Sequence, residues 1–101
     1  MSKEFPDLVK ALPIFQGQFD AYKLESEKFD VLFSSYPAGT AIQPHEHDTE
    51  NIGVVTSGRL SLTKDGRVTE VGPGEWYHLD KNQQHAAAFE VDTQLMEIWF
   101  R

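Results

Sequence analysis

The sequence predicts an all-β protein built from short strands, either a sandwich or a barrel. Three observations support this prediction. Short runs rich in aromatic and β-branched residues recur along the chain, and glycine, proline or Asp-Gly turn signals separate them at close intervals. Beyond the first residues, no segment keeps the 3.6-residue hydrophobic period of a helix. These features are typical of antiparallel sheets packed face to face or closed into a barrel.

The elements are expected in a simple order. Residues 1–16 form a short amphipathic arm, with one helical turn around Asp7–Leu12 that Pro13 ends. Residues 59–64 and 67–71 form a hairpin around Asp65-Gly66, a strong short-range hairpin signal. The other runs that predict strands are FDAYKLE (19–25), KFDVLFSSY (28–36), ENIGVVTSG (50–58), EWYHL (75–79), HAAAFEV (85–91) and TQLMEIWF (93–100).

Composition bounds the class of protein. The chain has 101 residues, near the usual size of one domain, so a single domain over residues 1–101 is expected. The net charge of −7 leaves no basic face for a nucleic acid backbone. No signal peptide and no membrane span are visible, so the cytoplasm is the expected location. Without cysteine, a metal must be held by histidine, carboxylate, amide or backbone oxygen.

Two histidines two residues apart, His45 and His47, suggest a metal site. If Pro44–Val55 is mostly extended, the alternation of side chains places these histidines and Asn51 on one face of the strand. Glu50 then lies on the opposite face and could join them only through a bulge that shifts the register. Two imidazoles at positions i and i+2 can both reach one ion at about 2.0–2.2 Å.

A third histidine, His85, follows the polar loop DKNQQ and could complete a three-histidine set. The alternative interpretation of the same pattern is a polar, solvated edge without a metal.

The segment Gly39–Gly58 resembles the first motif of the cupin superfamily. That motif runs glycine, five residues, HxH, three or four residues, glutamate, six residues, glycine, and here Asn51 stands at the glutamate position. The segment Gly74–Phe89 resembles the second motif. Its glycine and histidine are matched by Gly74 and His85, while its proline, glycine and final asparagine are replaced by Asp80, Asn82 and Phe89. The resemblance implies a double-stranded β-helix, a jelly-roll barrel preceded by the short arm, with both motifs within residues 39–89.

The resemblance also implies a metal centre inside the barrel. By position, its ligands are His45, His47, Asn51 and His85, and the cofactor is a divalent transition metal such as Zn, Ni, Fe, Mn or Cu. An amide in place of a carboxylate leaves more positive charge on the ion. We therefore expect weaker metal affinity, stronger Lewis acidity and a preference for an anionic ligand. Alternatively, Asn51 does not reach the metal, and three histidines leave open positions for water and substrate.

Two further residues are candidates for proton transfer. His78 shares a strand face with Trp76, and Glu97 shares one with Trp99. If these faces line the cavity, His78 is an acid–base group and Glu97 a partly buried acid with a raised pKa. The alternatives are a structural histidine in the barrel and a solvent-facing carboxylate. The Glu97–Trp99 pair and the amide at position 51 are also loosely similar to small cupins of the KdgF type, which act on unsaturated uronates.

Three classes of function remain open at this point. The first is a metal-dependent enzyme of isomerase or lyase type acting on a small polar or anionic metabolite, with a dioxygenase as its main variant. The second is a cupin that binds or senses a small molecule without catalysis. The third is a storage or structural protein, which would leave the motif histidines unexplained. Cupins commonly pair through an outer sheet, and the apolar residues of the arm (Phe5, Leu8, Leu12, Ile14 and Phe15) favour a homodimer.

Overall fold

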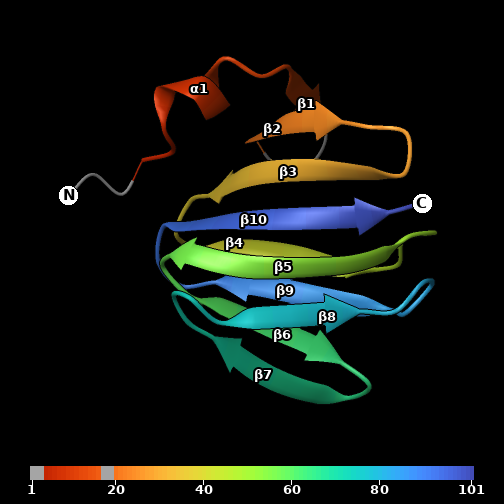
Figure 1. The fold of residues 1–101 in the computed structure, drawn as a ribbon. Helices are drawn as coiled ribbons and strands as arrows, with labels where there is room; N and C mark the ends of the chain where they lie inside the picture. Colours follow the sequence, from red (N-terminus) through yellow and green to blue (C-terminus); the bar gives the residue numbers. More distant parts are fainter. Residues whose placement is uncertain (1–3, 17–19) are drawn as a thin grey trace.

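The computed structural model describes residues 4–16 and 20–101, and these residues fold into one short helix and two antiparallel sheets (Figure 1). The elements are α1 (Asp7–Lys10), β1 (Ile14–Gln16), β2 (Asp20–Glu25), β3 (Phe29–Tyr36), β4 (Thr40–His45), β5 (Glu50–Ser57), β6 (Leu60–Lys64), β7 (Arg67–Val71), β8 (Trp76–Leu79), β9 (His85–Phe89) and β10 (Thr93–Phe100).

The chain passes back and forth between the two sheets. The larger sheet has the order β1-β2-β3-β10-β5-β8, and the smaller has the order β4-β9-β6-β7. From β3 to β6, and again from β8 to β10, each successive strand lies in the opposite sheet (Figure 1). The predicted all-β jelly roll is therefore confirmed.

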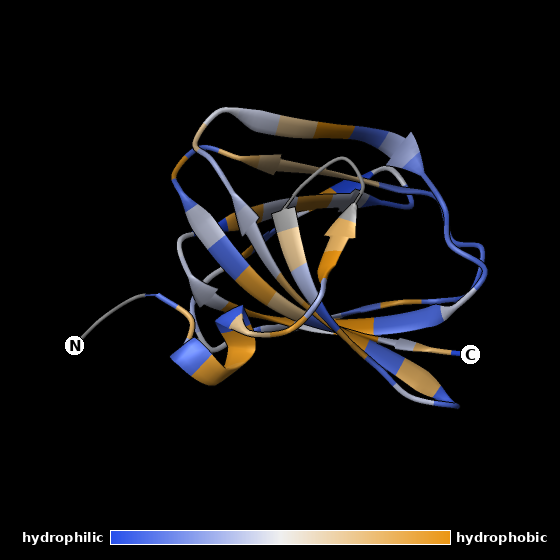
Figure 2. Cartoon of the chain, turned by 90° about the horizontal axis from the view of Figure 1, so that it is seen from above, coloured by the Kyte–Doolittle hydropathy of each residue, from blue (hydrophilic) through white to orange (hydrophobic). Residues whose placement is uncertain are grey.

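The core lies between the inner faces of the two sheets. Alternation along β3 buries Leu32, Ser34 and Tyr36, while Phe33 and Ser35 between them stay partly exposed. Tyr36 stacks on Phe89 of the opposite sheet, with ring centroids 4.1 Å apart. Seen from above, apolar and polar segments alternate along the strands, as expected where one face of each sheet is buried (Figure 2).

The hairpin between β6 and β7 forms as predicted. Asp65 and Gly66 both adopt positive φ, 52° and 73°, which is the backbone of a type I′ turn. Strand pairing runs from Leu60 opposite Val71 to Lys64 opposite Arg67.

The N-terminal arm departs in part from the expectation. Its helical turn forms as α1, but its last residues form β1 and extend the larger sheet by pairing with β2. Phe5 packs against Phe33 with ring centroids 5.7 Å apart, so the arm is held on the sheet. The expectations for residues 1–3 and Phe19 lie outside the described residues. In the described part of the chain, no helix has the length and apolar character that crossing a membrane requires.

The expectation that Pro44–Val55 is one extended run is wrong. β4 ends at His45 and β5 begins at Glu50, and the two strands lie in different sheets. The register of β4 against β9 shifts between Ile42 and His45, where Pro44 has no backbone N–H to donate to a ladder. Residues 46–49 then carry the chain across to the larger sheet.

Candidate metal centre

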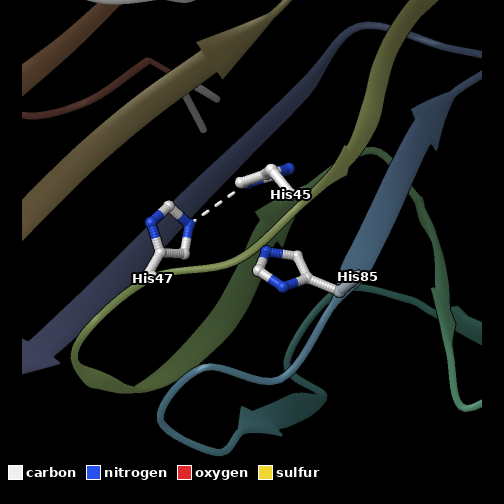
Figure 3. A group of neighbouring side chains, drawn as sticks. All are labelled: His45, His47 and His85. Carbon is white, nitrogen blue, oxygen red and sulfur yellow. Dashed lines mark hydrogen bonds between the residues drawn. The ribbon is translucent and has the colours of Figure 1, made fainter.

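Three histidine side chains converge inside one end of the barrel (Figure 3). His45 ends β4, His47 follows two residues later in the loop, and His85 begins β9, where it lies opposite His45 in the sheet register. The ring centroids are 4.8 Å apart for His45 and His47, 4.3 Å for His45 and His85, and 5.2 Å for His47 and His85. One nitrogen from each ring lies within 4.8 Å of the others.

Backbone carbonyls fix the orientation of two of these rings. His45 Nδ1–H donates to the carbonyl oxygen of Gln43, and His85 Nδ1–H donates to that of Gln83, each over 2.9 Å. Each Nε2 is thereby left as the nitrogen with the free lone pair. The Nε2 atoms of His45 and His47 are only 3.2 Å apart. Holding Nδ1 on a carbonyl is the usual way in which a protein orients a ligating histidine.

Burial favours the neutral form of two of the three imidazoles, those of His47 and His85. Burial, followed by the neighbouring His45 and His85, lowers the pKa of His47 to about 4. Burial also lowers the pKa of His85, although the Gln83 carbonyl opposes that shift. Because neutral imidazole is the form that binds a metal, these shifts and the three-nitrogen donor set fit a divalent transition metal.

The loop before β9 is tied to the loop that carries His47. The backbone N–H of Asn82 donates 2.7 Å to the carbonyl oxygen of His47, and Asn82 adopts a φ of +59°. This conformation explains one departure from the second cupin motif. Where the motif has glycine, this chain has asparagine, which tolerates the left-handed region better than other residues with side chains.

Asn51 faces the barrel interior, as the strand alternation predicted. Its register partners are Leu79 on β8 and Trp99 on β10, and both of those side chains line the cavity next to the histidines. Asn51 is only 1% exposed, and its Oδ1 accepts a hydrogen bond of 2.6 Å from Thr49 Oγ1. Its role as a metal ligand stays a prediction.

His78 and Glu50 lie on the outer face of the larger sheet. Alternation along β8 sends Tyr77 and Leu79 inward, while Trp76 and His78 point to solvent. His78 Nε2 contacts Glu50 Oε2 at 2.6 Å, and both side chains are about half exposed, 45% and 57%. The prediction that His78 lines the cavity is therefore wrong.

Glu97 is part of the cavity wall. Trp99 Nε1–H donates 3.1 Å to Glu97 Oε1, and the hydroxyl of Tyr77 donates to Oε2. Burial raises the pKa of Glu97, although these two donors oppose the shift. The residue thus has the partly buried environment and the direction of pKa shift expected of a proton-transfer group.

One small cavity brings these groups together. Its volume is about 40 Å³, and it is lined by the three histidines, by Glu97 and by Tyr77 and Trp99, with apolar side chains of both sheets around them. Trp99 also lies against His47, with ring centroids 4.7 Å apart. Among the described residues that line it, none is a lysine or an arginine. A cavity of this size holds no more than a few waters or a small ligand group.

Sequence reasoning missed Tyr77 and Gly53. Their connection to Glu97 is visible only in the strand register, where Gly53 pairs with Tyr77 on one side and with Glu97 on the other. The order of the strands in the sheet, which the sequence does not show, was the missing information.

The amino-acid sequence matches one known protein family, that of the cupin domain. The model of the cupin domain family matches residues 32–100 of the chain. This stretch contains all three histidines of the centre. It also contains β8, which carries Tyr77, and β10, which carries Glu97 and Trp99.

Individual relatives agree with that match. The chain is 37% identical over 71 residues to the H2HPP isomerase of Bacillus subtilis, a match that covers 68% of this chain and 30% of that protein. The chain therefore spans less than a third of that relative's length. The structure of KdgF from Halomonas sp. superposes with a TM-score of 0.77 at 17% identity, covering 87% of this chain and 84% of that one. An RmlC-like cupin from Shewanella frigidimarina gives a TM-score of 0.80 at 15% identity, covering 90% and 85%. At these identities the two structures support the fold alone.

Proposed function

The chain belongs to the cupin domain family, and on this premise we propose that it is a metal-dependent enzyme of isomerase or lyase type that moves a proton on a small polar or anionic metabolite. The proposal depends on one observation. Three imidazoles and one carboxyl group with a raised pKa line the same small cavity. A metal-binding group and a proton-transfer group are the two parts that such a reaction needs.

His45, His47 and His85 would hold the metal, which we expect to be Zn, Ni, Fe, Mn or Cu because each of these accepts imidazole nitrogen. When bound, the ion supplies Lewis acidity toward a substrate oxygen. Because the three ligands are neutral, they leave the charge of the ion uncancelled, which favours an anionic substrate group. We propose Asn51 as a neutral fourth ligand, in a position where its Oδ1 now accepts from Thr49.

Glu97 is the proposed acid–base group. Its raised pKa brings the exchange of its proton closer to neutral pH, where a general acid or base works best. The donors Tyr77 and Trp99 hold its two oxygens in place. The apolar side chains around the cavity limit the access of water to this carboxyl group. The isomerase relative supports this type of reaction for the chain.

The first test is the metal content of untagged protein. We expect near one equivalent of a single transition metal in the wild type and its loss in His85→Ala. The matched control is His78→Ala, because His78 is also a histidine at a strand but lies on the outer face. Equal metal content in all three proteins, or none in the wild type after incubation with Zn, Ni, Mn and Fe(II), would contradict the metal centre.

The second test is solvent deuterium exchange, which reports proton transfer on any compound that the cavity accepts. Metal-loaded protein is incubated in D₂O with a panel of small 2-oxo acids and ketoses, and exchange at carbon is followed by NMR. We expect exchange with part of the panel and its loss in Glu97→Gln with unchanged metal content. Stoichiometric binding of a panel member without exchange would instead favour a non-catalytic binding protein.

A further inference from the structure

Gly53 is the central member of a row of three residues across the larger sheet. In the register it lies opposite Tyr77 of β8 on one side and Glu97 of β10 on the other. Directly paired residues in antiparallel strands project to the same face of a sheet. All three positions therefore face the barrel interior, and the side chains of Tyr77 and Glu97 both line the cavity.

The ring of Tyr77 occupies the space that a side chain at position 53 would take. A Cβ on Gly53 would lie 2.6 Å from Tyr77 Cε1, and closer still to Cζ and the hydroxyl oxygen. Gly53 is not among the glycines of the described chain with positive φ, so its backbone would accept an alanine. The glycine is thus required for space and not for conformation.

This space lets Tyr77 reach past β5 to β10. Its hydroxyl donates to Glu97 Oε2, while Trp99 Nε1–H donates to Oε1. The two carboxyl oxygens are held by donors from two different strands. A glycine in the interior of a strand lowers the stability of that strand. A buried carboxyl group also lowers the stability of the fold unless it is hydrogen-bonded. An apolar residue at position 97 would need neither the glycine nor the two donors.

We propose that Gly53 is a positioning residue for the cavity acid: the absence of a side chain allows Tyr77 to cross β5 and fix the Glu97 carboxyl group in one orientation. The inference rests on the proposed function for the chemical role of Glu97. It adds two residues, Gly53 and Tyr77, that act through Glu97.

Indole NMR resonances provide a direct test with an internal control. The chain has two tryptophans, and only Trp99 donates to Glu97, whereas Trp76 is 57% exposed on the outer face. A carboxylate that loses one donor accepts more strongly from the remaining donor. We therefore expect Gly53→Ala and Tyr77→Phe to shift the Trp99 indole resonance in the same direction and to leave that of Trp76 in place. An unmoved Trp99 resonance in both variants would overturn the proposal.

Gly72→Ala is the matched control for the loss of a glycine. Its added Cβ would meet only the end of the Glu75 side chain, at 3.1 Å, so the Trp99 resonance should not move. If Gly53→Ala does not fold, Tyr77→Phe still decides the question, because it removes the hydroxyl and keeps the ring. A Trp99 shift in Gly72→Ala equal to that in Gly53→Ala would also count against the proposal.

A double variant tests the steric part. The variant Tyr77→Leu removes the ring atoms that a Cβ on Gly53 would meet. Gly53→Ala should therefore lower the unfolding midpoint less in a Tyr77→Leu background than in the wild type. An equal loss in both backgrounds would show that Gly53 serves another purpose. Metal content should be unchanged in all these variants. Absence of metal or of deuterium exchange would therefore defeat the proposed function alone, whereas an unmoved Trp99 resonance would defeat this inference alone.

Discussion

The backbone N–H of Asn82 donates a hydrogen bond of 2.7 Å to the carbonyl oxygen of His47. This bond joins the loop before β9 to the loop between β4 and β5. The first of these loops belongs to the second cupin motif and the other to the first cupin motif. His85 and His47 are thereby held relative to one another before any metal binds. The stability of the centre should therefore depend on the backbone conformation of Asn82.

The first prediction concerns that conformation. Asn82→Ala should lower the free energy of unfolding by about 1 kcal/mol, because alanine lacks the short polar side chain that lets asparagine tolerate a φ of +59°. It should also weaken zinc binding, measured by calorimetry on metal-free protein. Asn82→Gly is the control and should lose less stability than Asn82→Ala, because glycine adopts a positive φ at no steric cost. Equal losses in the two variants would show that the asparagine side chain matters and the conformation does not.

The second prediction concerns the linkage between metal and folding. A ligand that binds only the folded state stabilises it, by about 2.7 kcal/mol at a free concentration of 100 times Kd. Zinc should therefore raise the melting temperature of the wild type and have no such effect on His47→Ala. His78→Ala should keep the full increase, because His78 lies outside the cavity. A zinc response that disappears in His78→Ala instead would place the metal on the outer face, between His78 and Glu50.

The third prediction separates Asn51 from its neighbour Glu50. Asn51→Ala leaves the Thr49 hydroxyl without its acceptor inside the protein and should cost about 1–3 kcal/mol of stability. It should also lower metal content if the amide is the fourth ligand. Glu50→Ala should leave metal content unchanged, because Glu50 is exposed and contacts His78 on the outer face. Metal loss from Glu50→Ala alone would contradict the inward placement of Asn51.

Strand alternation predicted part of the site because it is a local property. It correctly assigned Leu95, Glu97 and Trp99 to one face of β10, and it placed Asn51 inward and Glu50 outward. It did not decide which face of β8 is buried, since both faces carry an aromatic or apolar residue. Burial of Tyr77 depends on the space above Gly53, and that space exists only after β8 and β5 have paired.

The crossing between sheets at residues 46–49 shows the second limit. The sequence there has no strong turn signal apart from Pro44, and the extended run that it predicts is broken by the tertiary fold. The histidines nevertheless meet, because the register shift between Ile42 and His45 leaves His45 opposite His85 on β9. The spacing of the motif predicted this meeting through family resemblance, whereas periodicity alone would have given the wrong path for the chain.

The fourth prediction is a homodimer at micromolar concentration. Apolar side chains of the arm and of the larger sheet remain exposed, notably Leu8 at 85%, Ile14 at 65% and Trp76 at 57%. Phe5 does not contribute, since it packs on Phe33 within the chain. Ile14→Glu should shift the sedimentation coefficient toward that of a monomer, and Val68→Glu, an equally exposed position on β7, should not. A single 11.5 kDa species in the wild type would contradict the prediction.

The fifth prediction is the pH dependence of stability in the metal-free protein. Folding lowers the pKa of His47 from 6.5 to about 4, so above pH 6.5 His47 is neutral in both states and contributes nothing. Between pH 6.5 and 4 the unfolded chain binds a proton at this residue and the folded protein does not. The free energy of unfolding therefore decreases as the pH is lowered through this range. The loss from this residue is at most about 3 kcal/mol, and solvent around the half-buried ring reduces it.

Denaturant unfolding at pH 7 and pH 4.5 measures this loss. His47→Gln should reduce it, since glutamine does not titrate. If the variant loses as much stability as the wild type over this range, the acid sensitivity comes from other groups, and the imidazole of His47 is solvated in the folded protein.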